Sequence, residues 1–264
     1  MRLDAYITIK NSSISRSRAK ALIEAGSVTL DGRVITKPSF AVDDALEHSL
    51  ELDLNEMPYV SRGGLKLEGA LNSFDVDPAG RVCADIGSST GGFTDCLLQR
   101  GAARVYAVDS GTDQLAESLR ADPRVRLYEQ FNARSLTEST FGEACSLAVA
   151  DLSFISQTYV LAPIASILSP NGEYIGLIKP QFECGRGALG KGGIVKDTSE
   201  HFKAVRRVLD SAEDVGFEVQ SVAYSPIRGG DGNVEFLFHA VKKDGEIISY
   251  PDERIKELIK NGKK

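Results

Sequence analysis

From residue 81 onward, short apolar runs alternate with stretches that have the periodicity of helices. Seven runs of strand length follow one another: VCADI, VYAVD, VRLYE, LAVAD, YIGLIK, VQSVAY and VEFLFHA. Such alternation is typical of α/β domains, in which helices connect the strands of a mainly parallel sheet. We therefore predict a seven-stranded, mainly parallel sheet of the Rossmann-like class. Ligands of such folds gather at the carboxyl ends of strands, so the residues that end the runs are the first candidates for a site.

The turn after the first run is crowded with glycine and serine, because residues 85–93 read DIGSSTGGF. No lysine follows Gly91 and Gly92, which disfavours a phosphate-binding P-loop, and the residues after Gly87 break the GxGxxG spacing of dinucleotide folds. The pattern instead resembles the S-adenosylmethionine-binding turn of Rossmann-like methyltransferases, where small residues let the backbone approach the cofactor. The turn residues expected to bind this cofactor are Asp85, Gly87, Ser88, Ser89, Thr90, Gly91, Gly92 and Phe93.

Three later positions complete the expected cofactor site. Asp109 ends the second run, where a carboxylate can accept hydrogen bonds from both hydroxyls of a ribose. Asn132 and Ala133 follow the third run, where side-chain amide or backbone groups could read the adenine edge. Asp151 ends the fourth run and is expected at the same edge of the sheet.

Charged residues also accompany the later apolar runs. Asp151 ends LAVAD, Lys179 follows YIGLI, and Glu235 lies in the last run between two apolar residues that face the other way. A lysine placed after a buried strand is partly desolvated, which favours the neutral amine that can act as a base. Singly, each residue could be a surface charge or half of a buried ion pair. Their joint occurrence favours a catalytic cluster.

The first 57 residues differ from the rest in charge and in element order. Residues 1–40 contain seven Lys or Arg against three Asp or Glu, whereas residues 41–56 contain six acids and no Lys or Arg. Ser15 is placed to cap a short basic helix that Gly26 ends, and Asp31-Gly32 suits a tight hairpin between two strand-like runs. We predict a small α+β domain at 1–57, a linker at 58–61, a second domain at 62–245 that begins with a helix to Phe74, and a basic tail at 246–264.

The element order RLDAYI, SRSRAKALIEAG, VTLDGRVI resembles the small RNA-binding domain first described in the fourth protein of the small ribosomal subunit. Lys66 in SRGGLKL, together with Asp151, Lys179 and Glu235, resembles the Lys-Asp-Lys-Glu tetrad of FtsJ-like ribose 2'-O-methyltransferases. With DIGSSTGGFT, NAR, ADLSFIS, KPQFE and GNVE, the chain resembles the TlyA family, also labelled hemolysin A, from about residue 2 to about residue 240. One stretch departs from the family: GTDQL follows Asp109 where relatives commonly read GYGQL, so an aromatic ring beside the cofactor is missing.

The resemblance implies an S-adenosylmethionine-dependent enzyme that methylates ribose 2'-hydroxyls of cytidines in ribosomal RNA, free or in ribosomal subunits. A ribose hydroxyl is a poor nucleophile until it loses its proton, whereas the sulfonium methyl is already activated, so the reaction needs a base and alignment more than a metal. We expect in-line transfer to a hydroxyl that Lys179 deprotonates. Lys66 would stabilise the charge growing on the attacking oxygen, and Asp151 and Glu235 would hold the two lysines.

Basic residues of both domains are expected to contact the RNA. In the small domain, the resemblance places a basic helix against the RNA backbone. In the large domain, the segment FECGRGALGKGGIVKD contains five glycines, which indicates a mobile surface loop that we expect to close over the target nucleotide. The residues expected to contact RNA are Arg2, Arg16, Arg18, Lys20, Arg62, Arg134, Arg186 and Lys191.

Composition sets the remaining expectations. The 264 residues carry a formal net charge of -6, contain no apolar stretch near the roughly 18 residues that span a bilayer, and begin without a signal-peptide pattern. We expect a cytoplasmic protein with no membrane contact. Four scattered cysteines form no CxxC pair, which predicts neither a metal site nor a disulfide framework. The alternatives are a non-enzymatic RNA-binding or ribosome-associated protein, a membrane-active hemolysin, and a nicotinamide-dependent oxidoreductase, which the glycine spacing disfavours.

Overall fold

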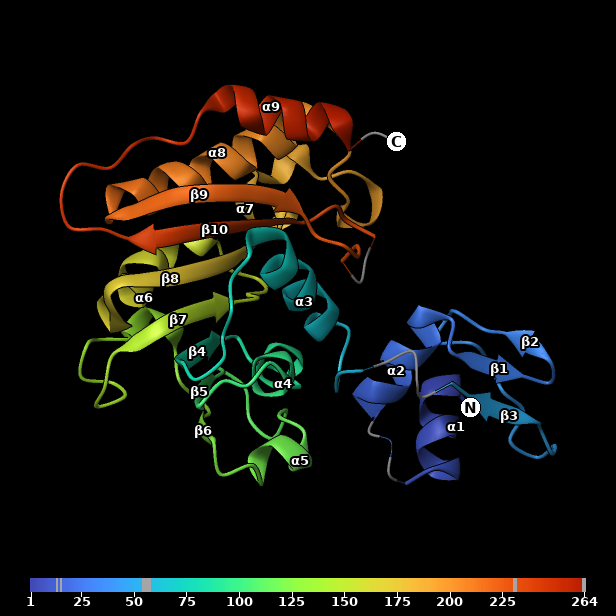
Figure 1. Ribbon diagram of the computed structural model, residues 1–264. Helices are drawn as coiled ribbons and strands as arrows, with labels where there is room; N and C mark the ends of the chain where they lie inside the picture. The colour runs from blue at the N-terminus through green and yellow to red at the C-terminus, as the bar shows by residue number, and fades with distance from the viewer. Residues whose placement is uncertain (13, 15, 54–57, 230–231, 263–264) are drawn as a thin grey trace. The chain divides into compact units, whose positions relative to one another are not determined.

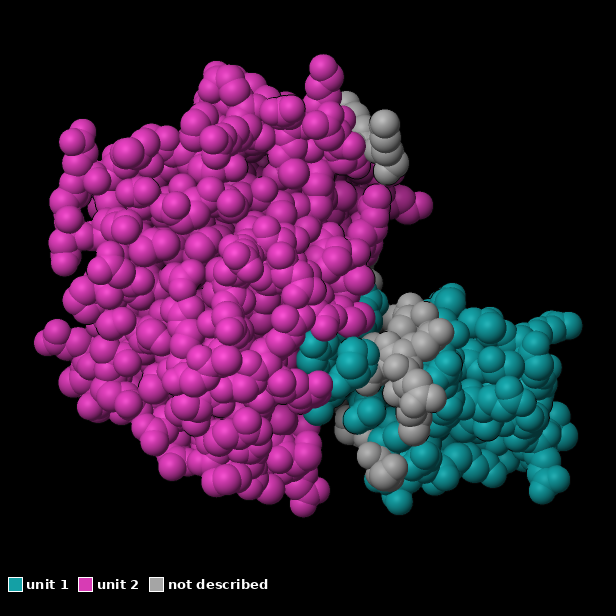
Figure 2. Space-filling view, in the orientation of Figure 1, with its two compact units in different colours: residues 1–64 teal, residues 65–264 magenta. Residues whose placement is uncertain are grey.

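The computed structural model describes residues 1–264 except 13, 15, 54–57, 230–231 and 263–264, and only the backbone of residues 17, 21, 24, 25 and 186. The chain forms two compact units, Met1–Gly64 and Leu65–Lys264, which Figure 2 distinguishes by colour. The linker expected at 58–61 lies just before this division, and the exact domain limits stay a prediction. No helix in the described part of the chain is both long and apolar enough to cross a membrane.

The first unit packs two helices against a small sheet. The helices are α1 (Leu3–Lys10) and α2 (Arg16–Ala25), and the strands, in spatial order, are β2 (Arg33–Val34), β1 (Val28–Leu30) and β3 (Leu50–Leu52). Asp31 and Gly32 join β1 to β2 with φ values of +50° and +75°, the left-handed backbone that a tight hairpin requires. Gly26 follows α2 with φ +82°, as expected of a residue that ends a helix. Ser15, the expected cap of α2, lies outside the described residues.

The third strand of this unit was not expected from the sequence. β3 pairs antiparallel with β1, with Glu51 opposite Thr29, and it follows a stretch of acidic residues that shows no strand pattern. The core of the unit is made of apolar side chains from both helices, from β1 and from two connecting segments, all at most 5% exposed: Leu3, Tyr6, Ile7, Ile14, Ala19, Leu22, Ile23, Val28, Leu30 and Val42.

The second unit contains the predicted seven-stranded sheet, so the fold class is confirmed. In spatial order the strands are β6 (Val125–Tyr128), β5 (Arg104–Val108), β4 (Val82–Ile86), β7 (Cys145–Ala150), β8 (Leu168–Ile178), β10 (Phe236–Lys242) and β9 (Phe217–Tyr224). Pairing is parallel from β6 to β8, and β10 is antiparallel to both of its neighbours. The start of β10 therefore lies at the same edge of the sheet as the carboxyl ends of the parallel strands.

Helices cover both faces of this sheet (Figure 1). They are α3 (Gly63–Phe74), α4 (Gly92–Gln99), α5 (Glu117–Arg120), η1 (Ala133–Ser135), η2 (Gln157–Tyr159), α6 (Leu161–Ile167), α7 (Pro180–Glu183), η3 (Arg186–Ala188), η4 (Lys191–Gly193), α8 (Thr198–Asp214) and α9 (Asp252–Asn261). Phe238 of β10 belongs to the core that α6, α8 and α9 cover, whereas the next residue, His239, stacks on Phe74 of α3 at 5.8 Å. Because successive strand residues point to opposite faces, α3 covers the other side of the sheet.

The basic tail is expected to be helical beyond Asp252, and the helix α9 found there packs into the fold. Ile255 and Ile259 of α9 are 0% and 6% exposed, and both are part of the core formed by α8 and the sheet. The opposite face of α9 is made of polar side chains. Because lysines are numerous in this segment, the sequence did not show that its two isoleucines pack into the core.

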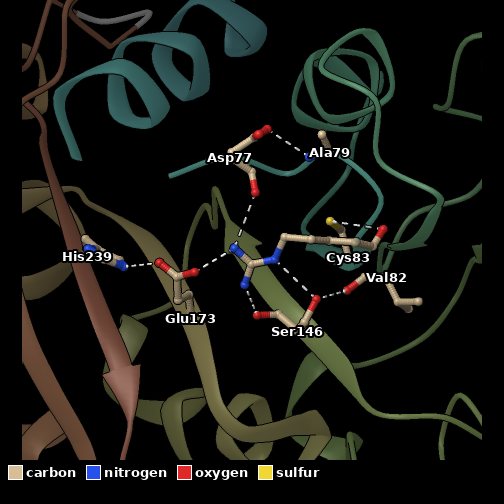
Figure 3. A network of polar contacts seen from close by, with 8 residues as sticks. Asp77, Ala79, Val82, Cys83, Ser146, Glu173 and His239 are labelled. Carbon is tan, nitrogen blue, oxygen red and sulfur yellow. Dashed lines mark hydrogen bonds and ion pairs between the residues drawn. The ribbon is translucent and has the colours of Figure 1, made fainter. Parts of the chain in front are cut away.

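An ion-pair network ties four strands together at the edge of the sheet opposite the candidate site (Figure 3). Arg81, which precedes β4, pairs with Glu173 of β8 at 2.6 Å and bonds to Ser146 of β7, and His239 of β10 bonds to the second oxygen of Glu173 at 2.7 Å. The hydrogen bond from His239, aided by Arg81, lowers the pKa of the Glu173 carboxyl to about 2. The network links these strands while the carboxyl ends of the parallel strands remain available for a site.

Candidate active site

The four residues expected to form a tetrad meet at the carboxyl edge of the sheet. Asp151 directly follows β7 and Lys179 directly follows β8. Glu235 immediately precedes β10, rather than lying inside that strand, and the pairing of Phe236 with Ile178 brings it beside Lys179. Lys66 reaches this edge from the first turns of α3.

The tetrad is a continuous chain of ion pairs. Lys66 Nζ lies 2.6 Å from Glu235 Oε2 and 3.7 Å from Asp151 Oδ2, and Lys179 Nζ lies 2.5 Å from Asp151 Oδ1. Lys179 Nζ also donates a hydrogen bond of 2.9 Å to Ser153 Oγ. The Glu235 side chain is 2% exposed and that of Asp151 21%, so the cluster runs from the interior toward solvent.

A small pocket of about 290 Å³ opens onto the tetrad. Its walls include both lysines and Glu235, with Leu189 and Gly193 of the glycine-rich segment on another side. A purely structural ion pair has no need of a pocket, whereas a reacting group does. Within the described residues, no group of three or more His, Cys, Asp or Glu side chains could hold a metal ion.

A larger cleft of about 1420 Å³ lies next to this pocket and has several wall residues in common with it. Among the residues expected to bind the cofactor, those that line the cleft are Gly87, Ser89, Asp109, Asn132, Ala133 and Asp151. Gly87 has φ +87°, and a Cβ there would lie 2.8 Å from the carbonyl oxygen of Asp151. A side chain at this position would therefore close the passage between the turn and the end of β7, so the turn requires glycine.

Asp109 is fixed by the backbone at the floor of the cleft. Its Oδ2 accepts a hydrogen bond from Ser89 N at 2.8 Å, and its Oδ1 accepts one from Gly111 N at 2.7 Å. Each carboxylate oxygen can accept a further bond, so Asp109 has capacity for two hydroxyl groups. Gln114 belongs to GTDQL, the stretch that differs from the family pattern. It accepts a hydrogen bond from Ser89 Oγ at 3.2 Å and also lines the cleft.

Asn132 both lines the cleft and starts η1. Its side-chain oxygen accepts a hydrogen bond from Arg134 N at 3.0 Å, which caps the 3-10 turn. The amide NH2 of Asn132 and the backbone of Ala133 are the groups left to meet an adenine edge.

The other predicted cofactor residues do not line the cleft. Ser88, Thr90, Gly91, Gly92 and Phe93 belong to the turn and to the start of α4, and their cofactor contacts stay predictions. Asp85, inside β4, is completely buried, and its Oδ2 accepts a hydrogen bond of 2.6 Å from Thr94 Oγ1. Burial raises the pKa of the Asp85 carboxyl to about 7, with the charges of Asp151 and Asp109 adding to the effect.

Two further features of the site were not found from the sequence. Phe154 has φ +65° and is 91% exposed, an unusual backbone and an unusual exposure for an aromatic residue, and it lines both the cleft and the pocket. Its ring packs against Phe182 at 5.4 Å. Ser153 bonds to Lys179, as described above. In the motif ADLSFIS only the Asp carried a chemical signal, because serine and phenylalanine are common in any loop.

The predicted RNA contacts occupy different environments. In the first unit, Arg2 and Arg16 both pair with the buried Asp4, at 2.9 and 3.5 Å, and Arg2 holds the pKa of that carboxyl below its ordinary value. Lys20 is exposed. In the second unit, Arg134 lies at the exposed wall of the cleft and Lys191 on the surface of the glycine-rich segment. The side chain of Arg186 lies outside the described residues, and Arg18 and Arg62 are partly buried.

Comparison with known proteins is consistent with this arrangement. The family model for FtsJ-like methyltransferases matches residues 59–242, and that for the S4 domain matches residues 1–47. A 16S/23S rRNA (cytidine-2'-O)-methyltransferase, TlyA of Mycobacterium tuberculosis, is 45% identical over 236 residues, which cover 89% of this chain and 88% of the relative. Hemolysin A of Brachyspira hyodysenteriae is 41% identical over 242 residues, covering 91% of this chain and 100% of the relative. The solved structure of a protein designated a hemolysin from Streptococcus thermophilus is 42% identical, with a TM-score of 0.80, and the match covers 99% of this chain and 94% of that one.

Proposed function

This chain belongs to the TlyA/hemolysin A family of FtsJ-like methyltransferases, and from that membership we propose that it methylates the ribose 2'-hydroxyl of cytidine in ribosomal RNA, with Lys179 as the base. The observation that carries the proposal is the position of Lys179 Nζ. It lies in a pocket that adjoins the cofactor cleft, and Asp151 and Ser153 hold it there at 2.5 and 2.9 Å.

The residues of the cleft suit S-adenosylmethionine. A glycine at position 87 leaves space between the turn and the end of β7, and Asp109 offers an acceptor to each ribose hydroxyl. Asn132 and Ala133 line the same cleft and offer an amide and backbone groups to an adenine edge. When bound, S-adenosylmethionine supplies a methyl group that is activated by its attachment to a positively charged sulfur.

The contacts around Lys179 fit the requirements of a base. Ser153 Oγ accepts a hydrogen bond from Lys179 Nζ at 2.9 Å, and Asp151 Oδ1 lies 2.5 Å from the same nitrogen. These two groups hold the amine in the pocket, where its lone pair would take up the proton of a hydroxyl. The proton would pass to Lys179 as the 2'-oxygen attacks, and Asp151 would stabilise the resulting ammonium.

Lys66 has the complementary role. Glu235 Oε2 and Asp151 Oδ2 lie 2.6 and 3.7 Å from Lys66 Nζ, so two carboxylates balance the charge of this side chain inside a mostly buried cluster. A fixed positive charge beside the pocket stabilises negative charge that develops on the attacking oxygen, and it needs no reorganisation during the reaction.

The exposed ring of Phe154 suits the base of the target nucleotide. Single-stranded or flipped bases are commonly held by stacking on aromatic side chains. The ring of Phe154, which lines both the cleft and the pocket, offers a surface for such stacking. The S4 domain would supply contacts to RNA outside the target through Arg2, Arg16, Arg18 and Lys20, and Arg62, at the start of the methyltransferase domain, would add another. Arg134, Arg186 and Lys191 would meet phosphates near the target.

The test compares Lys179→Ala and Lys179→Arg with the wild-type chain in a methyl-transfer assay on ribosomal RNA and ribosomal subunits. Both variants should lose at least 100-fold in rate, because alanine removes the base and arginine keeps the charge but cannot give up its proton. Affinity for S-adenosylmethionine, measured by calorimetry, should change less than threefold. Lys203→Ala, which removes an exposed lysine paired with Glu200 on α8, is the matched control. Near-normal transfer by Lys179→Arg would contradict the assignment of Lys179 as the base.

A further inference from the structure

The glycine-rich segment after α7, residues 185–195, forms one wall of the pocket that holds the tetrad. Leu189 lines both the pocket and the cleft, and Gly193 lines the pocket beside the two lysines. Gly192 and Gly193 have φ values of +75° and +74°, a pair of left-handed residues that few other amino acids would tolerate. We call this segment the glycine loop.

The glycine loop is built from two single-turn 3-10 helices, η3 and η4, which only short-range hydrogen bonds support. These bonds run from Ala188 N to Gly185 O, from Gly190 N to Ile194 O and from Gly193 N to Gly190 O, each at 3.0 Å. A loop with several glycines has many accessible conformations, so holding it in one of them costs conformational entropy. Contacts from outside the loop must provide the compensating stability.

Asn233 provides such contacts. Its side chain is almost completely buried, with the residue 1% exposed. Asn233 Oδ1 accepts a hydrogen bond of 3.0 Å from Val195 N, and Asn233 Nδ2 donates one of 3.1 Å to Gly193 O. The side-chain amide thus bonds to the loop as the backbone of a neighbouring strand would. His201 of α8 adds one contact from its Nε2 to Val195 O at 2.9 Å.

The position of Asn233 in the chain links the glycine loop to the tetrad. Asn233 stands two residues before Glu235, which pairs with Lys66. We propose that Asn233 is a positioning residue for methyl transfer, which fixes the glycine loop as the wall of the acceptor pocket in register with Lys66 and Lys179. The role of Asn233 in methyl transfer rests on the proposed function. Its hydrogen bonds to the glycine loop do not depend on that function.

The anchor requires a side chain with both an acceptor and a donor. Aspartate in place of Asn233 keeps the acceptor for Val195 N but sets a carboxylate oxygen against the carbonyl oxygen of Gly193, so one bond becomes a repulsion. Asn233→Asp should therefore release the loop while preserving the volume of the buried side chain. Asn233→Ser, which removes both bonds and adds no charge, replaces it if the first variant does not fold.

Two measurements on the full chain test the proposal. The first is limited trypsin digestion, with cleavage sites read by mass spectrometry. Cleavage after Lys191 should become at least 10-fold faster in Asn233→Asp, whereas cleavage elsewhere and the unfolding temperature should change little. The second is steady-state methyl transfer. We expect kcat/KM for RNA to fall about 10- to 100-fold, because misplacement of a pocket wall by about 1 Å has effects of this size, and the KM for S-adenosylmethionine to stay within threefold.

Asn72→Asp, an exposed substitution on α3, is the matched control and should behave as wild type in both assays. Unchanged cleavage after Lys191 in Asn233→Asp and Asn233→Ser would overturn the anchoring of the loop. Faster cleavage with unchanged kcat/KM would overturn the positioning role. If the proposed function itself is wrong, the wild-type chain will not methylate RNA. The digestion assay still tests the anchoring of the loop in that case, so the two failures can be told apart.

Discussion

Asp85 is a carboxyl group enclosed by the sheet, the turn and α4. The hydroxyl and the backbone N–H of Thr94 both donate to its side chain, but burial dominates and raises the pKa of Asp85 to about 7. In the unfolded chain the same carboxyl titrates near pH 3.8. The folded state therefore retains the proton between these two values, and the contribution of Asp85 to stability is complete below about pH 4 and is lost as the pH rises toward 7.

Asp85→Asn should raise the free energy of unfolding at pH 8 by up to about 4 kcal/mol, because the neutral amide can still accept the bond from Thr94 and has no charge to bury. The gain should shrink steadily toward pH 4. Urea unfolding at several pH values measures it. Asp113→Asn is the control, since Asp113 is 91% exposed and has φ +54°, which asparagine also tolerates. An equal or lower stability of Asp85→Asn at pH 8 would show that the buried carboxylate is compensated in the folded chain.

At the scale of helices and strands, repeating apolar patterns in the sequence predicted the strands of the large sheet. Features that depend on contacts between residues far apart in the chain were not predicted. Buried parallel strands are continuous apolar runs, so the residues that end β5, β7 and β8, including Asp109, Asp151 and Lys179, could be placed at one edge of the sheet. Nothing local showed that Asn233 bonds to the glycine loop, that Phe154 is held exposed, or that β3 pairs with β1. These features arise from contacts between segments 20 to 40 residues apart or from one unusual backbone angle.

The helix α9 illustrates the same limit and supports a test. Ile255 is completely buried in the core that α9 shares with α8, so Ile255→Ala should lower the free energy of unfolding by about 2–4 kcal/mol through lost burial and the cavity left behind. Glu257→Ala, on the exposed face of the same helix, should change it by less than about 0.5 kcal/mol. Urea denaturation followed by circular dichroism compares them. A small effect of Ile255→Ala would mean that α9 adds little to the folding unit.

At the scale of the whole molecule, charge is unevenly distributed along the chain. The chain carries a net charge of -6, yet residues 1–40 have an excess of positive charge, so attraction to a polyanion must be local. Binding through phosphate contacts weakens with salt in proportion to the number of counterions released. The salt dependence of RNA binding should therefore be set by the individual basic side chains that contact phosphates, and not by the net charge of the chain.

Lys20→Ala in the full chain should weaken binding to ribosomal RNA and reduce the slope of log K against log salt concentration by about 0.7 to 0.9, the value for one lost phosphate contact. Lys256→Ala, an exposed lysine of α9 in the other unit, should leave both quantities unchanged. Fluorescence anisotropy across a salt series provides the measurement. An unaltered slope for Lys20→Ala would remove this side chain from the RNA contacts.

The antiparallel direction of β10 has a consequence for biosynthesis. Because Glu235 enters at the start of that strand, the ion pair that holds Lys66 forms only after nearly nine-tenths of the chain has been synthesised. The parallel strands, Asp151 and Lys179 are all synthesised before Glu235. The tetrad is therefore completed by the last strand to enter the sheet, and Lys66 is the member that waits longest for its buried partner.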